Sequence, residues 1–155
     1  MAVKSFQGKR AEPEKPADPA MLVEDYMSTS LITFRKEEKV VDVIEKLIEN
    51  NISGGPVVNE NNELLGIISE GDCLKQISDS RYYNMPMEDL TVEKHMTCNV
   101  QTIDGKMNVL DAAKKFIELK RRRFPILEDG KLVGQISQRD VLRAALRLKG
   151  DTWWG

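Results

Sequence analysis

The chain has 155 residues, enough for one ordinary domain or for two half-sized units that share a core. Hydrophobic residues make up 41% and charged residues 31% of the sequence, a mix typical of globular proteins and not of disordered, collagen-like or membrane proteins. The 23 lysines and arginines are offset by 25 aspartates and glutamates, so the net charge of −2 argues against nucleic acid as a partner.

The cysteine and histidine content excludes several kinds of site. Cys73 and Cys98 cannot build a disulfide framework and do not form a Cys-x-x-Cys pair, and His95 is the only histidine. A zinc site and a Ser-His-Asp triad are therefore not expected, and Cys73 and His95 are predicted to be structural. No apolar run is long enough for a signal sequence or a membrane span, so we expect a cytoplasmic protein without a membrane partner.

In chain order, the sequence divides into five parts. Residues 1–20 combine proline, alanine and charge and are predicted to be a disordered tail. Residues 21–80 and 91–149 carry apolar residues at regular spacings and are predicted to be two structural repeats. Residues 81–90 connect them, and residues 150–155 form a C-terminal tail.

The two repeats are related by an internal duplication. Matching positions lie 69 residues apart in the first part of each repeat and 68 residues apart after a polar turn. The matched pairs include Met27 and Met96, Asp42 and Asp111, Pro56 and Pro125, and Asp72 and Asp140. The single deletion falls in the exposed turn, where a change of length is tolerated best.

Each repeat predicts the same order of elements. Apolar residues at helical spacing indicate an amphipathic helix over residues 40–48 and a copy of it over residues 109–117. A short strand follows at Pro56 and at Pro125, and a polar turn then leads to a second apolar strand.

Further elements begin and end each repeat. Extended segments at residues 31–33 and 100–103 come first, and Ser69 and Ser137 stand where the last helix begins, a position at which a hydroxyl caps free N–H groups. The predicted fold is mixed α/β, of the α+β class, with two tandem strand-helix-strand-strand-helix repeats packed pseudo-symmetrically. One repeat is marginal by itself, whereas two that share a core are not.

Three short motifs follow in the same order in both repeats: Asp-x-Met-Ser near the start, which reads Lys-x-Met-Thr in the second repeat, then a strand with an apolar-Pro-apolar pattern, and Gly-x-apolar-Ser-x-x-Asp at the end. The pattern resembles the cystathionine-β-synthase-type domain, or CBS domain, over about residues 22–78 and 91–149. One departure is Lys94, which stands where the first repeat has Asp25. The resemblance implies a tandem CBS pair, here a stand-alone one, whose clefts bind adenosine-containing ligands such as AMP, ADP, ATP or S-adenosylmethionine.

The resemblance also implies ribose-binding residues. In the family, the last aspartate of the Ser-x-x-Asp motif accepts hydrogen bonds from the ribose hydroxyls, and the serine lies close by. The residues that match this motif are Ser69, Asp72, Ser137 and Asp140. The alternative is that each serine caps a helix and each aspartate complements the helix dipole, with no ligand.

Positive charge is concentrated in the second repeat. Residues 120–123 are Lys-Arg-Arg-Arg, and a further arginine replaces Gly71 of the first repeat. The resemblance assigns phosphate binding to Arg139, Arg122 and Arg123, since a guanidinium binds phosphate through two parallel hydrogen bonds. We expect a phosphate-bearing ligand to be held mainly by these arginines with Ser137 and Asp140 on its ribose, although either cleft could use Arg122 or Arg123. A solvated basic helix end is the alternative.

The adenine pocket has a weaker signature, because the family holds the base with backbone groups and apolar side chains. By position, the resemblance implies residues of the opening segments and of the proline strands. The candidates are Thr29, Thr33, Val57, Asn99, Thr102 and Ile126.

The last predicted helix is apolar over a wide arc. At about 100° per residue, the apolar residues of segment 141–148 span roughly 200°, more than a helix with one buried face needs. One face is expected in the core and the other against a partner, which together with the family's habit of pairing modules through helices predicts a homodimer. Trp153 and Trp154 are either frayed or docked on that interface.

The function implied is that of a regulatory module. It senses an adenosine-containing ligand, changes conformation and signals to a regulated protein that the sequence does not identify. The sequence contains no nucleophile paired with a base, no phosphate-binding loop and no metal cluster, so no enzyme activity is expected. The alternative is a constitutive dimeric protein-interaction module with non-functional clefts.

Overall fold

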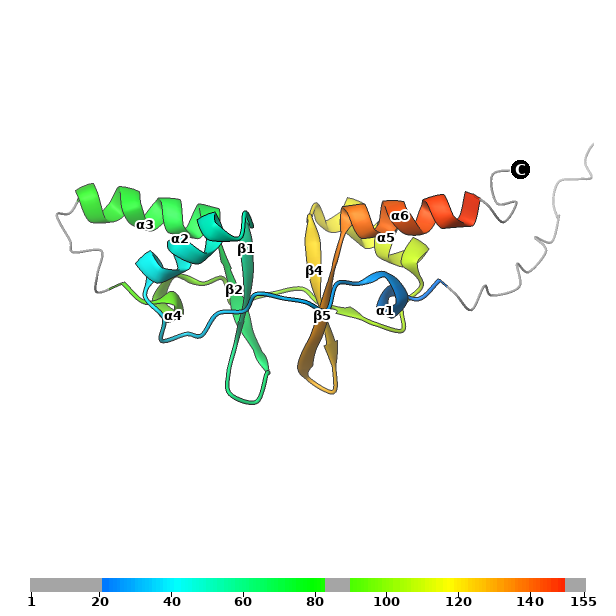
Figure 1. The fold of residues 1–155 in the computed structure, drawn as a ribbon, viewed down its shortest axis with the longest axis horizontal. Coiled ribbons are helices and arrows are strands. Elements are labelled where there is room, and N and C mark those ends of the chain that lie inside the picture. Colours follow the sequence, from blue (N-terminus) through cyan, green and yellow to red (C-terminus); the bar gives the residue numbers. More distant parts are fainter. Residues whose placement is uncertain (1–20, 83–89, 150–155) are drawn as a thin grey trace, which may run out of the picture.

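The computed structural model describes residues 21–82 and 90–149. It contains two halves that lie side by side, each with a β-hairpin near the centre and helices extending outward (Figure 1). The elements of the first half are α2 (Val40–Glu49), β1 (Gly54–Val58), β2 (Leu64–Ser69) and α3 (Glu70–Tyr82). Those of the second are α5 (Val109–Leu119), β3 (Ile103–Asp104), β4 (Arg123–Glu128), β5 (Lys131–Ser137) and α6 (Gln138–Lys149). The predicted fold class, with two pseudo-symmetric repeats, is confirmed.

The sheets are small and are built around the two hairpins. β1 pairs antiparallel with β2, and β4 pairs antiparallel with β5. β3 adds a parallel strand beside β4, whereas in the first repeat the equivalent pairing is a single bridge between Phe34 and Val57. The opening strand expected at residues 31–33 is therefore reduced to one bridge just after that segment.

The long helices follow the predicted pattern. α2 buries Val40, Val43 and Leu47, and α5 buries the matching Val109, Ala112 and Phe116. α3 runs to Tyr82, two residues beyond the expected end of the first repeat. Residues 1–20 and 150–155, where tails were predicted, lie outside the described residues, as do Trp153 and Trp154.

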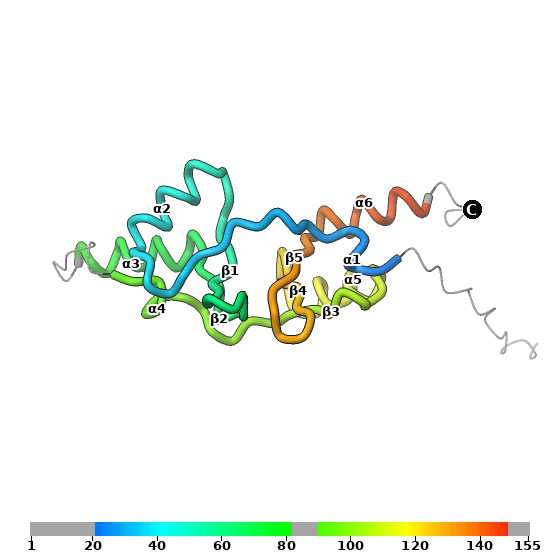
Figure 2. Tube along the Cα trace, turned by 60° about the horizontal axis from the view of Figure 1, so that its bottom comes forward, coloured from blue at the N-terminus to red at the C-terminus, as the bar shows by residue number. Residues whose placement is uncertain are grey.

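Two helices of four residues each were not predicted from the sequence: α1 (Val23–Tyr26) and α4 (Val92–His95). They show that the repeats exchange their opening segments. Val23 of the first repeat is buried in the core of the second, and Val92 of the second repeat is buried in the core of the first. In Figure 2 the two opening segments cross the middle of the molecule in opposite directions. Each core is therefore completed by a segment of the other repeat.

Glycine makes these crossings possible. The carbonyl of Thr97 accepts from the N–H of Ile67 at 2.9 Å, and the N–H of Thr97 donates to the carbonyl of Ile67 at 2.8 Å. A Cβ on Gly66 would lie 2.6 Å from the oxygen of Thr97, so no larger residue fits there unless the backbone moves. Gly134 has the same position in the second repeat, where a Cβ would lie 2.9 Å from the oxygen of Ser28.

None of the helices in the described ranges, 21–82 and 90–149, has the length and apolar character needed to cross a bilayer. The same ranges contain no group of three or more His, Cys, Asp or Glu side chains arranged to hold a metal ion.

Candidate functional site

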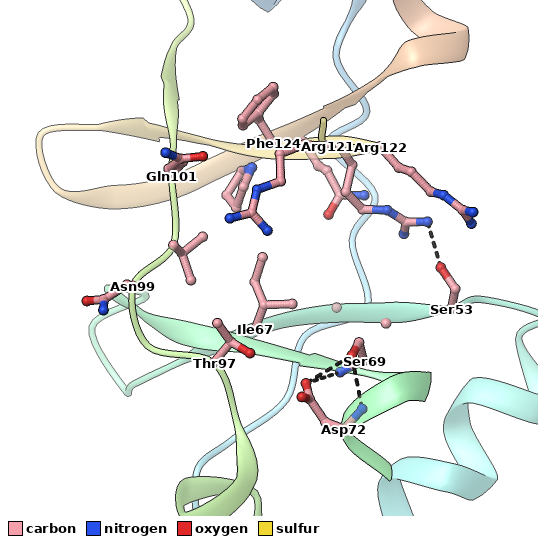
Figure 3. A pocket seen from close by; sticks show the side chains of 16 residues that line it. Ser53, Ile67, Ser69, Asp72, Thr97, Asn99, Gln101, Arg121, Arg122 and Phe124 are labelled. Carbon is pink, nitrogen blue, oxygen red and sulfur yellow. Dashed lines mark hydrogen bonds between the residues drawn. The ribbon is translucent and has the colours of Figure 1, made fainter. Parts of the chain in front are cut away.

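A cleft of about 230 Å³ lies at the centre of the molecule, between the two repeats. We call it the central cleft. One wall comes from the first repeat and consists of Ser53, Gly54, Gly55, Ile67, Ser69 and Asp72. The other comes from the second repeat and consists of residues 121–125 with Gln135. The crossing segment of the second repeat closes one side with Thr97, Asn99, Val100 and Gln101 (Figure 3).

Ser69 and Asp72 form a capping box at the first turn of α3. The Ser69 hydroxyl accepts from the N–H of Asp72 at 3.2 Å, while Asp72 Oδ2 accepts from the N–H and the hydroxyl of Ser69, both at 2.9 Å. The second carboxylate oxygen, Oδ1, makes no hydrogen bond within the described part of the chain. Helix capping and ligand binding are therefore compatible, because one oxygen serves each purpose.

The arginines of the opposite wall are held by the backbone around them. Lys120 ends α5 in the left-handed conformation, with φ at 53°, which turns the chain toward the cleft. The first residue of α6, Gln138, donates from its side chain to the carbonyl of Arg121 at 2.8 Å and from its N–H to that of Arg122 at 3.2 Å. Arg123 reaches across to the first repeat, where its guanidinium donates to the Ser53 hydroxyl at 2.7 Å (Figure 3).

The central cleft is electropositive. Among the described residues that line it, Arg121, Arg122 and Arg123 carry positive charge, and Asp72 is the one carboxylate. Arg121 and Arg122 are exposed, so both guanidinium groups are free to approach a ligand. An anion such as phosphate is favoured on this wall.

Two neighbours of the cleft have shifted pKa values. Burial raises the pKa of the Cys73 thiol, and the charges of Asp72 and Glu70 raise it further. Burial lowers the pKa of His95, and Lys94 lowers it further, against smaller opposing effects of Asp72 and Asp79. The thiol and the imidazole are therefore both neutral at neutral pH, and neither cancels or adds charge at the cleft.

The structure brings together five of the residues predicted for the site. Ser69, Asp72, Asn99, Arg122 and Arg123 all line the central cleft. The arginines of the second repeat thus face the Ser-x-x-Asp motif of the first repeat. The sequence had favoured Ser137 and Asp140 of the arginines' own repeat, which do not line this cleft.

The remaining predicted residues lie elsewhere. Val57 and Ile126 have no exposed surface, and each is part of a hydrophobic core, so neither side chain is accessible to a ligand in this conformation. Thr29, Thr102 and Arg139 are exposed and Thr33 is half-buried, and none of them lines the central cleft.

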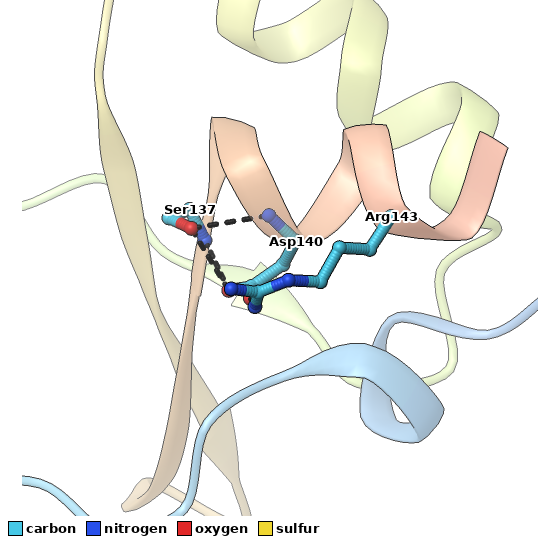
Figure 4. Close-up of polar contacts among 3 residues, drawn as sticks. All are labelled: Ser137, Asp140 and Arg143. Carbon is cyan, nitrogen blue, oxygen red and sulfur yellow. Dashed lines mark hydrogen bonds and ion pairs between the residues drawn. The ribbon is translucent and has the colours of Figure 1, made fainter. Parts of the chain in front are cut away.

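Ser137 and Asp140 form a second capping box at the start of α6. Asp140 Oδ2 accepts from the N–H of Ser137 at 2.8 Å and from its hydroxyl at 3.0 Å. The other oxygen, Oδ1, forms an ion pair with the Arg143 guanidinium at 3.1 Å, as Figure 4 shows. The two boxes have the same internal geometry and differ in this ion pair.

Several lining residues were missed from the sequence: Ser53, Ile67, Thr97, Gln101, Arg121 and Gln135. Arg121 belongs to the basic run at residues 120–123, and this run was the sequence signal by which Arg121 could have been found. For Thr97 and Gln101 the signal was their place beside Asn99 in the crossing segment. Ile67 and Gln135 occupy matching strand positions, which nothing local marks as facing a cleft.

The fold, with its central cleft between two repeats, is that of a pair of CBS-type repeats. The family model described as "CBS domain" matches residues 23–79 and 88–147, and the chain belongs to this family. This confirms the resemblance inferred from the repeated motifs.

Known relatives include proteins with bound adenosine compounds. The chain is 31% identical to CBSX2 of Arabidopsis thaliana, whose crystal structure in complex with AMP matches with a TM-score of 0.73 over 83% of this chain and 98% of that one. It is 28% identical to the CBS domain pair of protein MJ0100, solved in complex with 5′-methylthioadenosine and S-adenosyl-L-methionine, with a TM-score of 0.68 over 81% of this chain and 96% of that one.

Curated proteins with similar sequences include further CBS relatives. The chloroplastic CBS domain-containing protein CBSX1 of Arabidopsis thaliana is 35% identical over 134 residues, which cover 71% of this chain and 57% of that protein. A match to MJ1225 of Methanocaldococcus jannaschii covers 44% of that relative, so the chain spans about half the length of these curated relatives. The stand-alone character of the pair therefore stays a prediction.

Proposed function

We propose that this protein is a regulatory module that binds an adenine nucleotide in the central cleft. The observation that carries the proposal is the convergence of Asp72, an acceptor for ribose hydroxyls, with Arg121, Arg122 and Arg123 from the opposite repeat. The AMP complex of CBSX2, a protein of the same fold, supports it. Binding joins the two repeats through one molecule, so it favours one relative arrangement of the two halves and changes the surface offered to a regulated protein.

The charge of the cleft favours a nucleotide over S-adenosylmethionine. AMP, ADP and ATP carry phosphate, for which three guanidinium groups are suitable partners. S-adenosylmethionine has no phosphate, and its sulfonium and ammonium groups outweigh its carboxylate, so its net positive charge is disfavoured beside these guanidinium groups. The ligand class we propose is therefore the adenine nucleotides, with Ser69 and Asp72 at the ribose and the arginines at the phosphate.

Calorimetric titration tests this proposal. We expect AMP, ADP and ATP to bind, and S-adenosylmethionine to bind at least about tenfold more weakly. Arg122→Ala should lower AMP affinity by about tenfold through the loss of a charge-assisted hydrogen bond. Lys114→Ala is the matched control, because Lys114 is exposed on α5 and does not line the central cleft. Equal losses in both variants, or a preference for S-adenosylmethionine, would contradict the proposal.

We also propose that the protein is a homodimer, paired through its helices. The four long helices, α2, α3, α5 and α6, lie on one side of the molecule and the hairpin turns on the other (Figure 1). Large apolar side chains project from the helices into solvent in pairs related by the repeat: Ile48 with Ile117, and Leu74 with Leu142. Because the same apolar positions recur about the internal pseudo-two-fold axis, a second copy is the occupant that presents matching surfaces.

Charge placed on this helical face should separate the dimer. The double variant Ile117→Glu with Leu142→Glu is expected to weaken dimerisation by at least about 100-fold, since the exposed fractions of these two residues are 76% and 65% and neither supports the core. Sedimentation at tens of micromolar measures the change. Asn61→Glu, at the exposed hairpin turn, adds charge on the opposite side and should remain dimeric. A wild type that sediments as a monomer at that concentration would overturn this part of the proposal.

We propose that the chain has a regulatory role and no catalytic activity. The matching family model is the CBS domain, and relatives with enzyme names match over a small part of their length, such as 25% of L-aspartate semialdehyde sulfurtransferase of Methanocaldococcus jannaschii. A cytoplasmic location stays a prediction, because CBSX1 and CBSX2 are chloroplastic.

A further inference from the structure

The two Ser-x-x-Asp boxes have the same geometry, yet the residue three positions after each aspartate differs. Lys75 follows Asp72, and Arg143 follows Asp140. Arg143 pairs with the carboxylate of Asp140 at 3.1 Å, whereas Lys75 makes no ion pair within the described part of the chain. The difference lies at the atom that a ribose hydroxyl must reach.

Both carboxylate oxygens of Asp140 already accept hydrogen bonds within the repeat. One oxygen accepts twice from Ser137, and the other faces the Arg143 guanidinium. The Asp140 side chain is 11% exposed and that of Arg143 is 66% exposed, and the guanidinium lies against the carboxylate (Figure 4). A ribose hydroxyl at Asp140 would have to compete with this charged donor, and ribose hydroxyls are neutral donors that form weaker hydrogen bonds.

The second repeat's box also lacks the opposing positive wall. The arginines that face Asp72 occupy residues 121–123, and the matching positions of the first repeat are Ile52, Ser53 and Gly54. At these three positions, therefore, the opposite repeat offers no guanidinium to a phosphate next to Asp140. The second box therefore offers neither the unengaged carboxylate oxygen for ribose nor the opposing arginines for phosphate that the central cleft has.

We infer that Arg143 is a selectivity residue: it occupies the ribose acceptor of the second repeat and limits the chain to one adenine nucleotide, bound at Asp72. This inference rests on the proposed function of the central cleft and adds the number and place of the bound nucleotides. The two repeats thus have similar folds, but only the Ser69–Asp72 box binds a nucleotide.

Titration with AMP, followed by calorimetry and by amide NMR, tests the inference. The amides of Ser69 and Ser137 are reporters, because each donates to the carboxylate of its own box. In the wild type we expect one AMP per chain and a saturating shift of the Ser69 amide alone. In Arg143→Ala we expect a second, weaker site and a saturating shift of the Ser137 amide as well. Arg143 is largely exposed, so this variant should fold, and Arg143→Gln serves as a second variant.

Substitutions of Lys75 provide the matched controls. Lys75→Ala should keep one site and an unchanged affinity. Lys75→Arg places a guanidinium three residues after Asp72 and should weaken AMP binding by about two- to fivefold, the effect of a competing ion pair at this spacing. Two AMP molecules per wild-type chain, or a single site in both Arg143 variants, would overturn the inference. No AMP binding by the wild type would instead overturn the proposed function, so the two failures are distinct.

Discussion

Asp72→Asn is expected to lower the affinity for AMP by about 10- to 100-fold, the effect of losing hydrogen bonds between ribose and a charged acceptor. The Asp72 oxygen that accepts from Ser69 at 2.9 Å is engaged by the capping box, which leaves Oδ1 for the ligand. In asparagine the amide oxygen can keep the bonds to Ser69, but the remaining NH₂ group is a donor and cannot accept from ribose. Calorimetric titration with AMP measures the loss.

Asp140→Asn is the control for this prediction. It makes the same chemical change in the second box, which does not line the central cleft, and we expect AMP affinity to stay within about twofold of the wild type. Thermal unfolding of both variants shows whether each capping box survives the exchange. A similar loss of AMP affinity in the two variants would contradict the proposal that Asp72, and not Asp140, binds the ribose.

Gly66→Ala is expected to destabilise the protein by about 1–3 kcal/mol, the range for inserting a methyl group into a packed contact. The new Cβ would lie 2.6 Å from the oxygen of Thr97, a backbone atom that cannot rotate away. The crossing segment has to shift, and both hydrogen bonds between Ile67 and Thr97 weaken with it. Denaturant unfolding measures the change, and AMP affinity should fall too, because Thr97 lines the central cleft.

Gly71→Ala is the matched glycine control. A Cβ on Gly71 would have its nearest neighbour at 3.7 Å, the Ser69 hydroxyl, and the residue lies in the first turn of α3. Alanine should therefore stabilise the protein by about 0.4–1 kcal/mol by restricting the unfolded chain. The two substitutions are chemically identical and have opposite expected signs. If Gly66→Ala unfolds at the same denaturant concentration as the wild type, the close crossing does not constrain the fold.

Much of the fold follows from patterns within a few residues of one another. The helices α2 and α5 have apolar residues at helical spacing, and the hairpins have apolar runs on either side of a polar turn. The helices α1 and α4 were missed because four residues are too few to show a period. The opening strand of the first repeat was overestimated, because its pairing with β1 is completed at Phe34 alone.

The sequence predicted several residues of the candidate site but not which of them face one another. Ser69 and Asp72 carry a local motif and Arg122 and Arg123 a local charge pattern, so all four could be found in the sequence. Which aspartate faces which arginines depends on contacts between residues about 50 positions apart, and no local pattern encodes that. The buried Val57 and Ile126 were assigned to the adenine pocket for the same reason, since an apolar strand residue has the same signature whether it faces a core or a cleft.

That the 155 residues form two units and not one follows from the sequence alone, because the duplicated motifs keep their register through both halves. It also showed that a nearly neutral net charge conceals positive charge gathered in the second repeat. The position of that charge in the molecule depends on contacts between distant segments. The exchanged opening segments, which cross at Gly66 and Gly134, bring the arginines of one repeat against the Ser69–Asp72 box of the other. Packing between distant segments, which short-range patterns do not encode, places two similar repeats around one asymmetric cleft.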